Sequence, residues 1–213
     1  MTCAFPAIGL KWSAMSKPIL VGLTGGIGSG KTTVSKMFRS LGIPIYYADD
    51  RGKWLMAHDT SLKEQIIEAF GAESYDTTGV LNRAYLAEQV FGSESELQRL
   101  NALVHPAVGH DFTNWVKANE QHPYLIKEAA LIFEAGSYKQ LSKVITVSAP
   151  KAERMRRVML RDPQRSQRQI EDIISKQLSE NERKRRSDFV IDNSGRELVI
   201  PQVLAIDKKL RSL

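Results

Sequence analysis

The sequence predicts an α/β fold in which one parallel sheet is covered by helices on both faces. Three observations carry this prediction. Short runs that are apolar along most of their length alternate with segments of helical spacing, as expected for strands buried on both faces. A glycine-rich loop separates the first of these strands from a helix. Residues 51–120 show helical spacing and no convincing strand, which predicts a helical insertion between two strands.

The predicted core elements follow one another in chain order. We place the five strands at residues 19–23, 43–47, 124–133, 144–147 and 189–191. Apolar residues at helical spacing predict a helix through Val34 and Phe38 after the first strand. The same spacing predicts a closing helix through Val203, Ile206 and Leu210.

The insertion is expected to hold three helices. The first is closed by Gly71, and the second spans residues 81–91. The third begins after Ser93, which has a glutamate three residues later and so offers a capping box. Pro106 is expected to break or kink this third helix, because proline removes a helical hydrogen bond.

The segment between the last two strands is basic. Helices are predicted at 151–161 and 166–178. From Lys151 to Ser187 there are nine Arg and three Lys against six acidic residues, so the whole net charge of +6 lies here. A nucleic-acid binder usually spreads its positive charge along an extended face. A surplus in one segment better suits a local clamp for a few phosphates.

The 213 residues suffice for one sizeable core with insertions. A single cysteine, Cys3, excludes a disulfide framework and suits a reducing cytoplasm. No apolar run approaches the length of a membrane span. Residues 1–15 are mostly apolar at first, with Lys11 as their only charge, and we expect a disordered extension upstream of a truer start at Met15.

The glycine-rich loop Gly25–Thr32 fits the phosphate-loop pattern, Gly-x-x-x-x-Gly-Lys-Ser/Thr, at every position. Between a strand and a helix, its backbone N–H groups and the helix N-terminus are expected to face phosphate oxygens. Lys31 would reach the β- and γ-phosphates, and the Thr32 hydroxyl would ligate Mg²⁺. We therefore predict that a nucleoside triphosphate and Mg²⁺ bind at the loop, through Gly26, Ile27, Gly28, Ser29, Gly30, Lys31, Thr32 and Thr33.

A phosphate loop alone does not distinguish a kinase from a GTPase or a nucleic-acid motor. In GTPases and nucleic-acid motors, an Asp associated with Mg²⁺ usually stands at the end of a strand. Here Glu128 is the only acidic residue along the third predicted strand. A small core with a helical insertion and an Arg-rich segment matches small-molecule kinases better. Two alternatives stay open: a kinase for a nucleotide or nucleoside, and a nucleic-acid-binding regulator whose basic helices contact phosphates.

A series of short motifs follows the phosphate loop. They are Ala48-Asp49, Val104-His105-Pro106, Leu131-Ile132-Phe133-Glu134, Arg157, Arg161-Asp162, Gln177 and the run from Asp188 to Gly195. In order and spacing, from about Lys17 to the C-terminus, the chain resembles the dephospho-coenzyme A kinase family. The resemblance implies transfer of the ATP γ-phosphate to the ribose 3′-hydroxyl of dephospho-coenzyme A, the last step of coenzyme A synthesis.

Asp49 is the candidate catalytic base. A carboxylate at the tip of the strand beside the phosphate-loop strand would face the loop, and the matching Asp of the resembling family interacts with the acceptor hydroxyl. Position alone makes a helix N-cap an equal reading, and the resemblance favours catalysis. We assign the capping role to the neighbouring Asp50.

Arg157 and Arg161 are the candidate phosphate-clamping arginines. They are four residues apart and share a helix face, so both guanidinium groups could fork onto transferring phosphate oxygens. They also align with lid arginines of the resembling family. We assign the other basic residues of this segment to a solvated face: Arg154, Arg156, Arg165, Arg168, Arg183, Lys184, Arg185 and Arg186.

The resemblance also suggests substrate-side residues. His105, Phe133 and Glu134 are expected to face the acceptor, although a local hydrogen bond, a core position and a helix cap are the plainer readings. Asn193 is expected to border the adenine, or to form a plain turn. The family usually has Asp and Pro where this chain has Glu128 and Ala130, which leaves Mg²⁺ coordination by this strand open.

These inferences predict a P-loop NTPase fold of three layers. The nucleotide-binding core would comprise residues 16–50, 121–150 and 187–213, the acceptor domain residues 51–120, and a mobile lid residues 151–186. We expect a cytoplasmic monomer that binds ATP, Mg²⁺ and dephospho-coenzyme A, and that binds neither nucleic acid nor a membrane.

Overall fold

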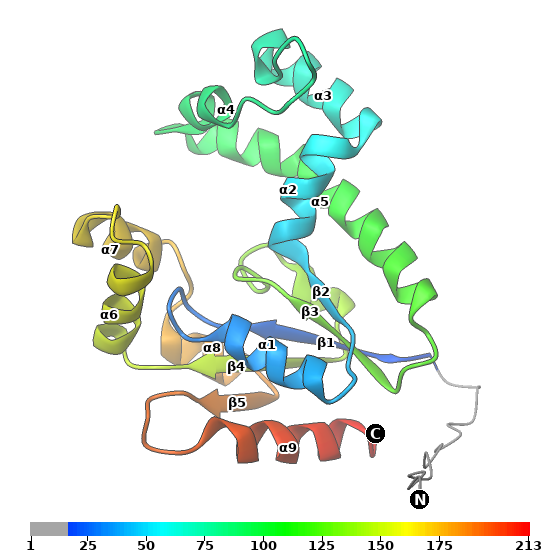
Figure 1. Cartoon of the computed structure of the whole chain (residues 1–213), viewed down its shortest axis with the longest axis vertical. Coiled ribbons are helices and arrows are strands. Elements are labelled where there is room, and N and C mark those ends of the chain that lie inside the picture. The colour runs from blue at the N-terminus through cyan, green and yellow to red at the C-terminus, as the bar shows by residue number, and fades with distance from the viewer. Residues whose placement is uncertain (1–16) are drawn as a thin grey trace, which may run out of the picture.

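Five parallel strands form one sheet in the computed structural model, which describes residues 17–213. The strand order is β2-β3-β1-β4-β5 (Figure 1). The strands are β1 (Ile19–Thr24), β2 (Ile45–Tyr47), β3 (Tyr124–Glu128), β4 (Lys143–Ser148) and β5 (Phe189–Asp192). The predicted five-stranded parallel sheet is thus confirmed. The expected extension at residues 1–15 lies outside the described residues.

The strand register brings the carboxyl ends of β1, β2 and β3 to the same edge of the sheet. Leu23 of β1 and Tyr47 of β2 both pair with Glu128 of β3. The residues that follow these positions therefore emerge side by side at the carboxyl ends of the strands, where ligands of open α/β sheets bind. These residues are the glycine-rich loop, the start of the insertion and Ala129.

Helices cover both faces of the sheet. On one face lie α1 (Lys31–Ser40) and α9 (Val199–Leu210), which contribute Phe38 and Val203 to a core shared with β1, β3, β4 and β5. The other face, near β2 and β3, packs against Phe112 of the insertion and Ile132 of the segment after β3. Both are almost fully buried. The arrangement has three layers, as predicted.

The insertion forms its own apolar cluster at one end of the molecule (Figure 1). Its helices are α2 (Ala48–His58), α3 (Thr60–Phe70), α4 (Arg83–Val90) and α5 (Glu94–Ala118). Ser93 caps α5 and accepts a hydrogen bond from the Glu96 N–H, but the predicted capping box is only half formed, because the Ser93 N–H donates to the Val90 carbonyl. Of the two outcomes predicted at Pro106, a break or a kink, the break is wrong, because α5 continues through the proline. Apolar side chains before and after the proline, Leu103 and Val108 among them, pack on the insertion cluster and hold the helix together.

The third strand is shorter than predicted and ends at Glu128. The Ala129 N–H still donates to the Leu23 carbonyl, but the chain then turns, and the Ala135 N–H donates to the Leu131 carbonyl. Ile132 and Phe133 are buried in this irregular segment. An apolar run alone does not separate a buried strand from a buried loop.

Three helices of the basic segment, which we call the Arg-rich helices, follow the carboxyl end of β4 (Figure 1). They are α6 (Lys151–Arg161), α7 (Gln167–Ser175) and α8 (Glu180–Arg186). Helix α7 begins with a capping box between Ser166 and Gln169. Helix α8 was not predicted, because its seven residues include no apolar side chain and so carry no period. No helix among residues 17–213 is long and apolar enough to cross a bilayer.

Candidate active site

The glycine-rich loop connects β1 to α1 and ends at a free helix terminus. Gly30 is the N-cap of α1 with φ 99°, a left-handed conformation that suits glycine, and no side chain of the described residues caps this helix. The first turn of α1 contains no acidic residue. The positive end of the helix dipole is therefore uncompensated and favours an anion at the loop.

Gly28 shows why the loop needs glycine. Its φ is 77°, and a Cβ added there would lie 2.3 Å from the backbone oxygen of Arg154 in α6. The loop is closed by a hydrogen bond of 3.0 Å from the Ser29 N–H to the Gly26 carbonyl. Close packing of α6 on the loop thus depends on the missing side chain.

Lys31 folds back over the loop. Its Nζ donates to the Gly25 carbonyl at 2.9 Å. Burial lowers the pKa of Lys31, and the carboxylates of Glu128 and Asp49 oppose this shift by favouring the ammonium form. One cation and two carboxylates therefore meet where β1, β2 and β3 end.

Asp49 lies in the first turn of α2, directly after β2. Its Oδ2 accepts a hydrogen bond of 3.3 Å from the Ala130 N–H, which ties the carboxylate to the chain after β3. The capping role assigned to Asp50 is wrong. Helix α2 begins at Ala48 with Tyr47 as its N-cap, so Asp50 is inside its first turn, exposed and paired with Lys53 at 3.2 Å.

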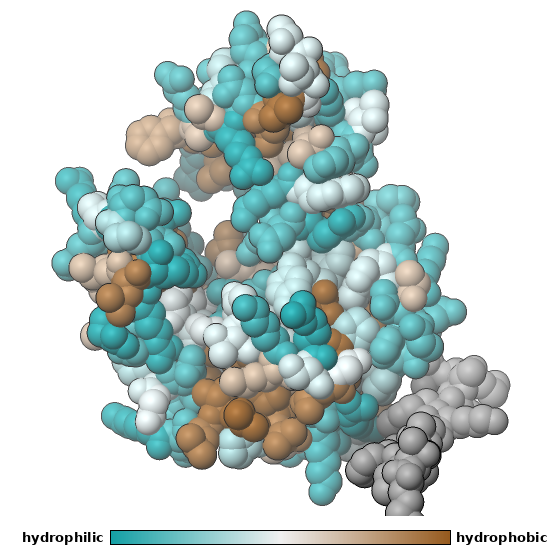
Figure 2. Space-filling model, in the orientation of Figure 1, coloured by the Kyte–Doolittle hydropathy of each residue, from teal (hydrophilic) through white to brown (hydrophobic). Residues whose placement is uncertain are grey.

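Two hollows meet at Asp49. The first is bounded by the phosphate loop and the Arg-rich helices, and its lining includes Lys31, Thr32, Asp49 and Arg161. The second lies against the insertion and includes Asp49 with His105. Each has a volume of about 570 Å³, within the range of small-molecule sites. Figure 2 shows the surface hollowed between the Arg-rich helices and the insertion.

Glu128 lines the first hollow at the end of β3. Its side chain is buried, and burial raises its pKa to about 6, while Lys31 works in the opposite direction and Asp49 and Asp50 add to the rise. It is unusual for a folded protein to keep a buried carboxylate beside a phosphate loop. This position is therefore a functional candidate.

The two candidate clamping arginines differ in their surroundings. Arg161 is mostly exposed, is held by Asp162 at 2.8 Å and lines the first hollow. Arg157 is half-buried against the loop, where its Nη1 and Nη2 donate to the backbone oxygens of Ser29 at 3.4 Å and Asn193 at 2.9 Å. Arg161 is thus directed at the hollow, and Arg157 tethers the loop.

Asn193 joins this tether. Its Nδ2 donates to the Ser29 carbonyl at 2.8 Å, and a Cβ on Gly30 would lie 2.3 Å from the same atom. The side chain thus packs on the phosphate loop itself.

The three candidate acceptor residues occupy different surroundings. His105, on α5, lines the second hollow, and Glu134 lines it too. The Oε1 of Glu134 also accepts a hydrogen bond of 2.7 Å from the Leu178 N–H, which links the second hollow to the Arg-rich segment. Phe133 is buried, and its ring packs against Tyr138 at 5.6 Å.

The assignment of Arg154 and Arg183 to a solvated basic face is wrong. Both side chains are buried, with 4% and 3% exposed. One signal was available for Arg154: it is four residues before Val158, which marks the buried face of α6. For Arg183 there was none, since α8 has no apolar period.

Gln177 was noted as a family motif but given no role. Its Oε1 accepts a hydrogen bond of 2.9 Å from the Ile27 N–H in the phosphate loop. The chain after α7 therefore contacts the loop directly, and sequence spacing could not have placed two residues so far apart in the chain together.

The comparisons with known proteins agree with this geometry. A family model described as dephospho-CoA kinase matches residues 19–198. The dephospho-CoA kinase of Salinibacter ruber is 42% identical over 177 residues, which cover 82% of this chain and 88% of that protein. A crystal structure from Thermus thermophilus matches with a TM-score of 0.78 at 31% identity, covering 93% of this chain and 99% of the other.

A further solved structure supports the fold alone. The dephospho-CoA kinase from Campylobacter jejuni matches with a TM-score of 0.67 at 22% identity, over 91% of this chain and 97% of that chain. The family model covers the phosphate loop, the insertion and the Arg-rich helices. The predicted family and activity are confirmed: the chain belongs to the dephospho-CoA kinase family, ATP-dependent P-loop kinases that catalyse the last step of coenzyme A biosynthesis.

Proposed function

We propose that Asp49 is the base of the phosphoryl transfer and that the two hollows hold the two substrates. The observation that carries this proposal is the position of Asp49, which borders both hollows and lies near Lys31. The hollow at the phosphate loop takes ATP. The hollow at the insertion takes dephospho-CoA, with its ribose 3′-hydroxyl directed at Asp49.

The proposed chemistry is one displacement at phosphorus. The 3′-oxygen forms a bond to the γ-phosphorus, the bond from that phosphorus to the β,γ-bridging oxygen breaks, and ADP leaves. The hydroxyl proton passes to the Asp49 carboxylate. Lys31 and Arg161 offset the negative charge on the transferring group, which is the main contribution that a protein makes to this reaction.

The proposal includes Mg²⁺ at the same hollow. Thr32, Asp49 and Glu128 all line it and offer a hydroxyl and carboxylates, the hard oxygen donors that Mg²⁺ prefers. No group of three or more acidic, histidine or cysteine side chains in residues 17–213 forms a metal site by itself. This fits Mg²⁺, which is usually held by one or two protein ligands together with substrate phosphates. Bound there, Mg²⁺ would neutralise phosphate charge.

The insertion is proposed as the acceptor domain, and residues 151–186 as the lid. Support comes from the linings: α5 contributes His105 to the second hollow, and α6 contributes Arg161 to the first. Closure of the lid would exclude water, which otherwise competes as acceptor. A cytoplasmic monomer, free of nucleic acid and of membrane, completes the proposal.

The test is mass analysis of the products after incubation with Mg-ATP and each of several acceptors. We expect dephospho-CoA to gain one phosphate, with little product from nucleotides or nucleosides. Lys31→Ala should abolish the product, because the loop then lacks its only side-chain ammonium. Equal phosphorylation of an unrelated nucleoside would refute the acceptor assignment, and full turnover by Lys31→Ala would refute the site.

A further inference from the structure

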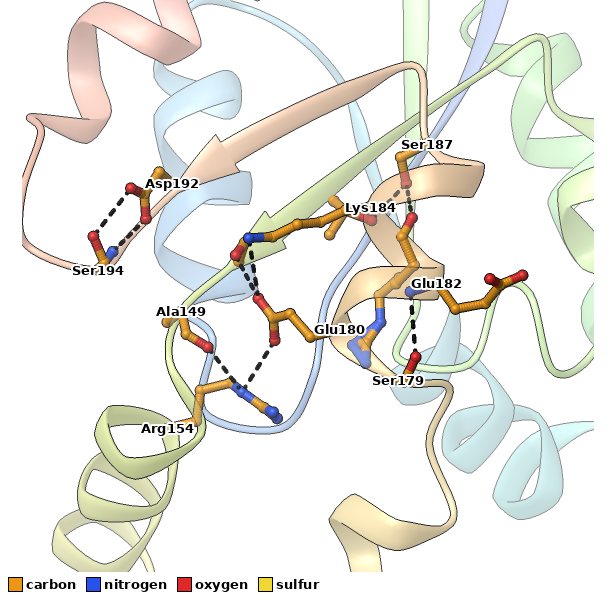
Figure 3. A network of polar contacts seen from close by, with 12 residues as sticks. Ala149, Arg154, Ser179, Glu180, Glu182, Lys184, Ser187, Asp192 and Ser194 are labelled. Atoms are coloured by element: carbon orange, nitrogen blue, oxygen red, sulfur yellow. Dashed lines mark hydrogen bonds and ion pairs between the residues drawn. The ribbon is translucent and has the colours of Figure 1, made fainter.

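Beneath the phosphate loop lies a cluster of charged side chains, two buried and one partly exposed, with no role in the mechanism above. It consists of Arg154 from α6 and Glu180 and Arg183 from α8, and we call it the loop-base cluster. Figure 3 shows Glu180 between Arg154 and Lys184. Both arginines are almost fully buried. A buried charge is costly, so its presence needs a reason.

Hydrogen bonds and ion pairs satisfy only some of the polar atoms of the cluster. The Nε of Arg154 donates to the Ala149 carbonyl at 3.1 Å and lies 3.5 Å from Glu180 Oε2. Glu180 is shared, because the Ser148 hydroxyl donates to it and Lys184 Nζ lies 4.0 Å away. Arg183 Nη2 donates to the Leu178 carbonyl. Arg154 Nη1 is fully buried and has no hydrogen-bond partner among the described residues.

Both guanidinium groups converge on one glycine of the loop. A Cβ added to Gly26 would lie 2.3 Å from Arg154 Nη1 and 3.3 Å from Arg183 Nη1. Gly26 has no positive φ that would itself demand glycine. The small residue is therefore explained by the approach of the two arginines. The Nη1 atom without a partner is directed at the loop backbone and not at an acceptor.

The cluster carries more positive than negative charge. Glu180 forms ion pairs with Arg154 and Lys184, and Arg183 lies in the field of Glu180 and Glu134, so three cations face two carboxylates. Burial lowers the pKa of Arg183, and the positive charge of Arg154 adds to the fall, while Glu180 and Glu134 oppose it. The field of Arg183 also reaches Lys31, where it helps to lower the pKa of that ammonium. The positive charge of the cluster therefore acts on Lys31, a residue of the phosphate loop.

We propose that Arg154 and Arg183 are positioning residues that form a second layer of positive charge behind the phosphate loop. They strengthen binding of the ATP polyphosphate through the loop backbone and without touching it. Glu180 fixes Arg154 in place and at the same time limits the size of the field. The inference rests on the proposal that the loop binds ATP. It adds that affinity should depend on charge that is hidden from solvent and therefore weakly screened by salt.

Two variants separate this electrostatic role from a structural one. Arg154→Met removes the charge and keeps an apolar chain of similar length. Glu180→Gln removes the opposing charge and keeps a hydrogen-bonding group of the same shape. If the pair only holds α6 to α8, both variants weaken ATP binding. If the field matters, their effects on ATP affinity have opposite signs.

The experiment measures ATP and ADP dissociation constants by calorimetry, together with the KM for dephospho-CoA. We expect Arg154→Met to weaken ATP binding about tenfold, as for one unit charge several ångströms away in a protein. ADP should lose less because it carries less charge, and the KM for dephospho-CoA should stay unchanged. Glu180→Gln should bind ATP at least as tightly as the parent protein, and Arg154→Lys should recover most of the lost affinity.

Arg156→Met is the matched control. It removes one positive charge from the same helix, but Arg156 is exposed and paired with Glu153, so ATP binding should not change. Unchanged ATP affinity in Arg154→Met, or equal losses for ATP and ADP, would overturn the inference. So would weaker ATP binding by Glu180→Gln, which also decides the matter if Arg154→Met does not fold. A parent protein that fails to bind ATP would instead refute the proposed function.

Discussion

Glu128→Gln should stabilise the protein while impairing it as an enzyme. The side chain is 8% exposed, and its burial raises the pKa from 4.5 to about 6. One pKa unit corresponds to about 1.4 kcal/mol, so ionised Glu128 costs the folded state about 2 kcal/mol. Gln has nearly the same shape and carries no charge. Replacement should therefore raise the free energy of unfolding by about 2 kcal/mol at pH 8.

The gain should depend on pH in a defined direction. Below pH 4.5 the carboxyl is protonated in both the folded and the unfolded chain, so the substitution changes nothing. As pH rises, the unfolded chain ionises first, and the folded state of the parent protein loses stability until pH passes about 6. The difference between variant and parent should thus grow across this window and stay level above it.

Urea unfolding at several pH values measures both curves. The matched control is Glu120→Gln, which removes a carboxylate that is exposed, in the turn before β3, and so lacks the burial on which the prediction rests. Turnover with Mg-ATP and dephospho-CoA should fall in Glu128→Gln, since the proposed Mg²⁺ site loses a carboxylate. A variant less stable than the parent at pH 8, or a stability difference that is the same at every pH, would show that burial is not the cause.

Three further substitutions have direct readouts. Asp49→Asn should lower kcat by about 10²-fold or more while leaving the ATP dissociation constant nearly unchanged, as expected for a lost base. Steady-state kinetics and calorimetry measure the two quantities, and a normal kcat would contradict the assignment of the base. Gly28→Ala should lower the free energy of unfolding by about 2–4 kcal/mol, because φ is 77° and the new Cβ meets a backbone oxygen at 2.3 Å; denaturation at neutral pH measures this, and a silent change would contradict the packing. Arg161→Met should lower kcat by about 10²-fold with an unchanged melting temperature, because the side chain is 62% exposed; a drop in melting temperature would indicate a structural role instead.

The sheet could be predicted because its strands are marked by composition. Val21, Leu23, Ile126 and Ile145 are fully buried, and each belongs to a short apolar run between helical segments. The prediction fails where a buried apolar residue does not belong to a strand. Ile132 is as buried as any strand residue and yet lies in a turn, and no local signal distinguishes the two.

The motif residues of the site could be predicted from the sequence, but the residues that pack against them could not. The type and spacing of Lys31 and Thr32 follow from phosphate chemistry, so one sequence suffices to propose them. Arg154 lies against Gly26, and Gln177 accepts a hydrogen bond from Ile27, and only the fold brings these distant residues together. An arginine in a basic run also resembles its solvated neighbours until burial is known.

The unbroken path of α5 has a mechanical consequence. Its 25 residues extend roughly 37 Å, and it shares one apolar cluster with α3 and α4 and another with the sheet, where Phe112 is buried. The insertion and the sheet are therefore joined by one continuous helix, and any change in their relative orientation would have to bend α5, most readily at Pro106. The proposed lid closure would then move α7 most easily, because the chain that follows it contacts the rest of the molecule through single hydrogen bonds at Gln177 and Leu178, whereas α6 and α8 carry the buried Arg154 and Arg183.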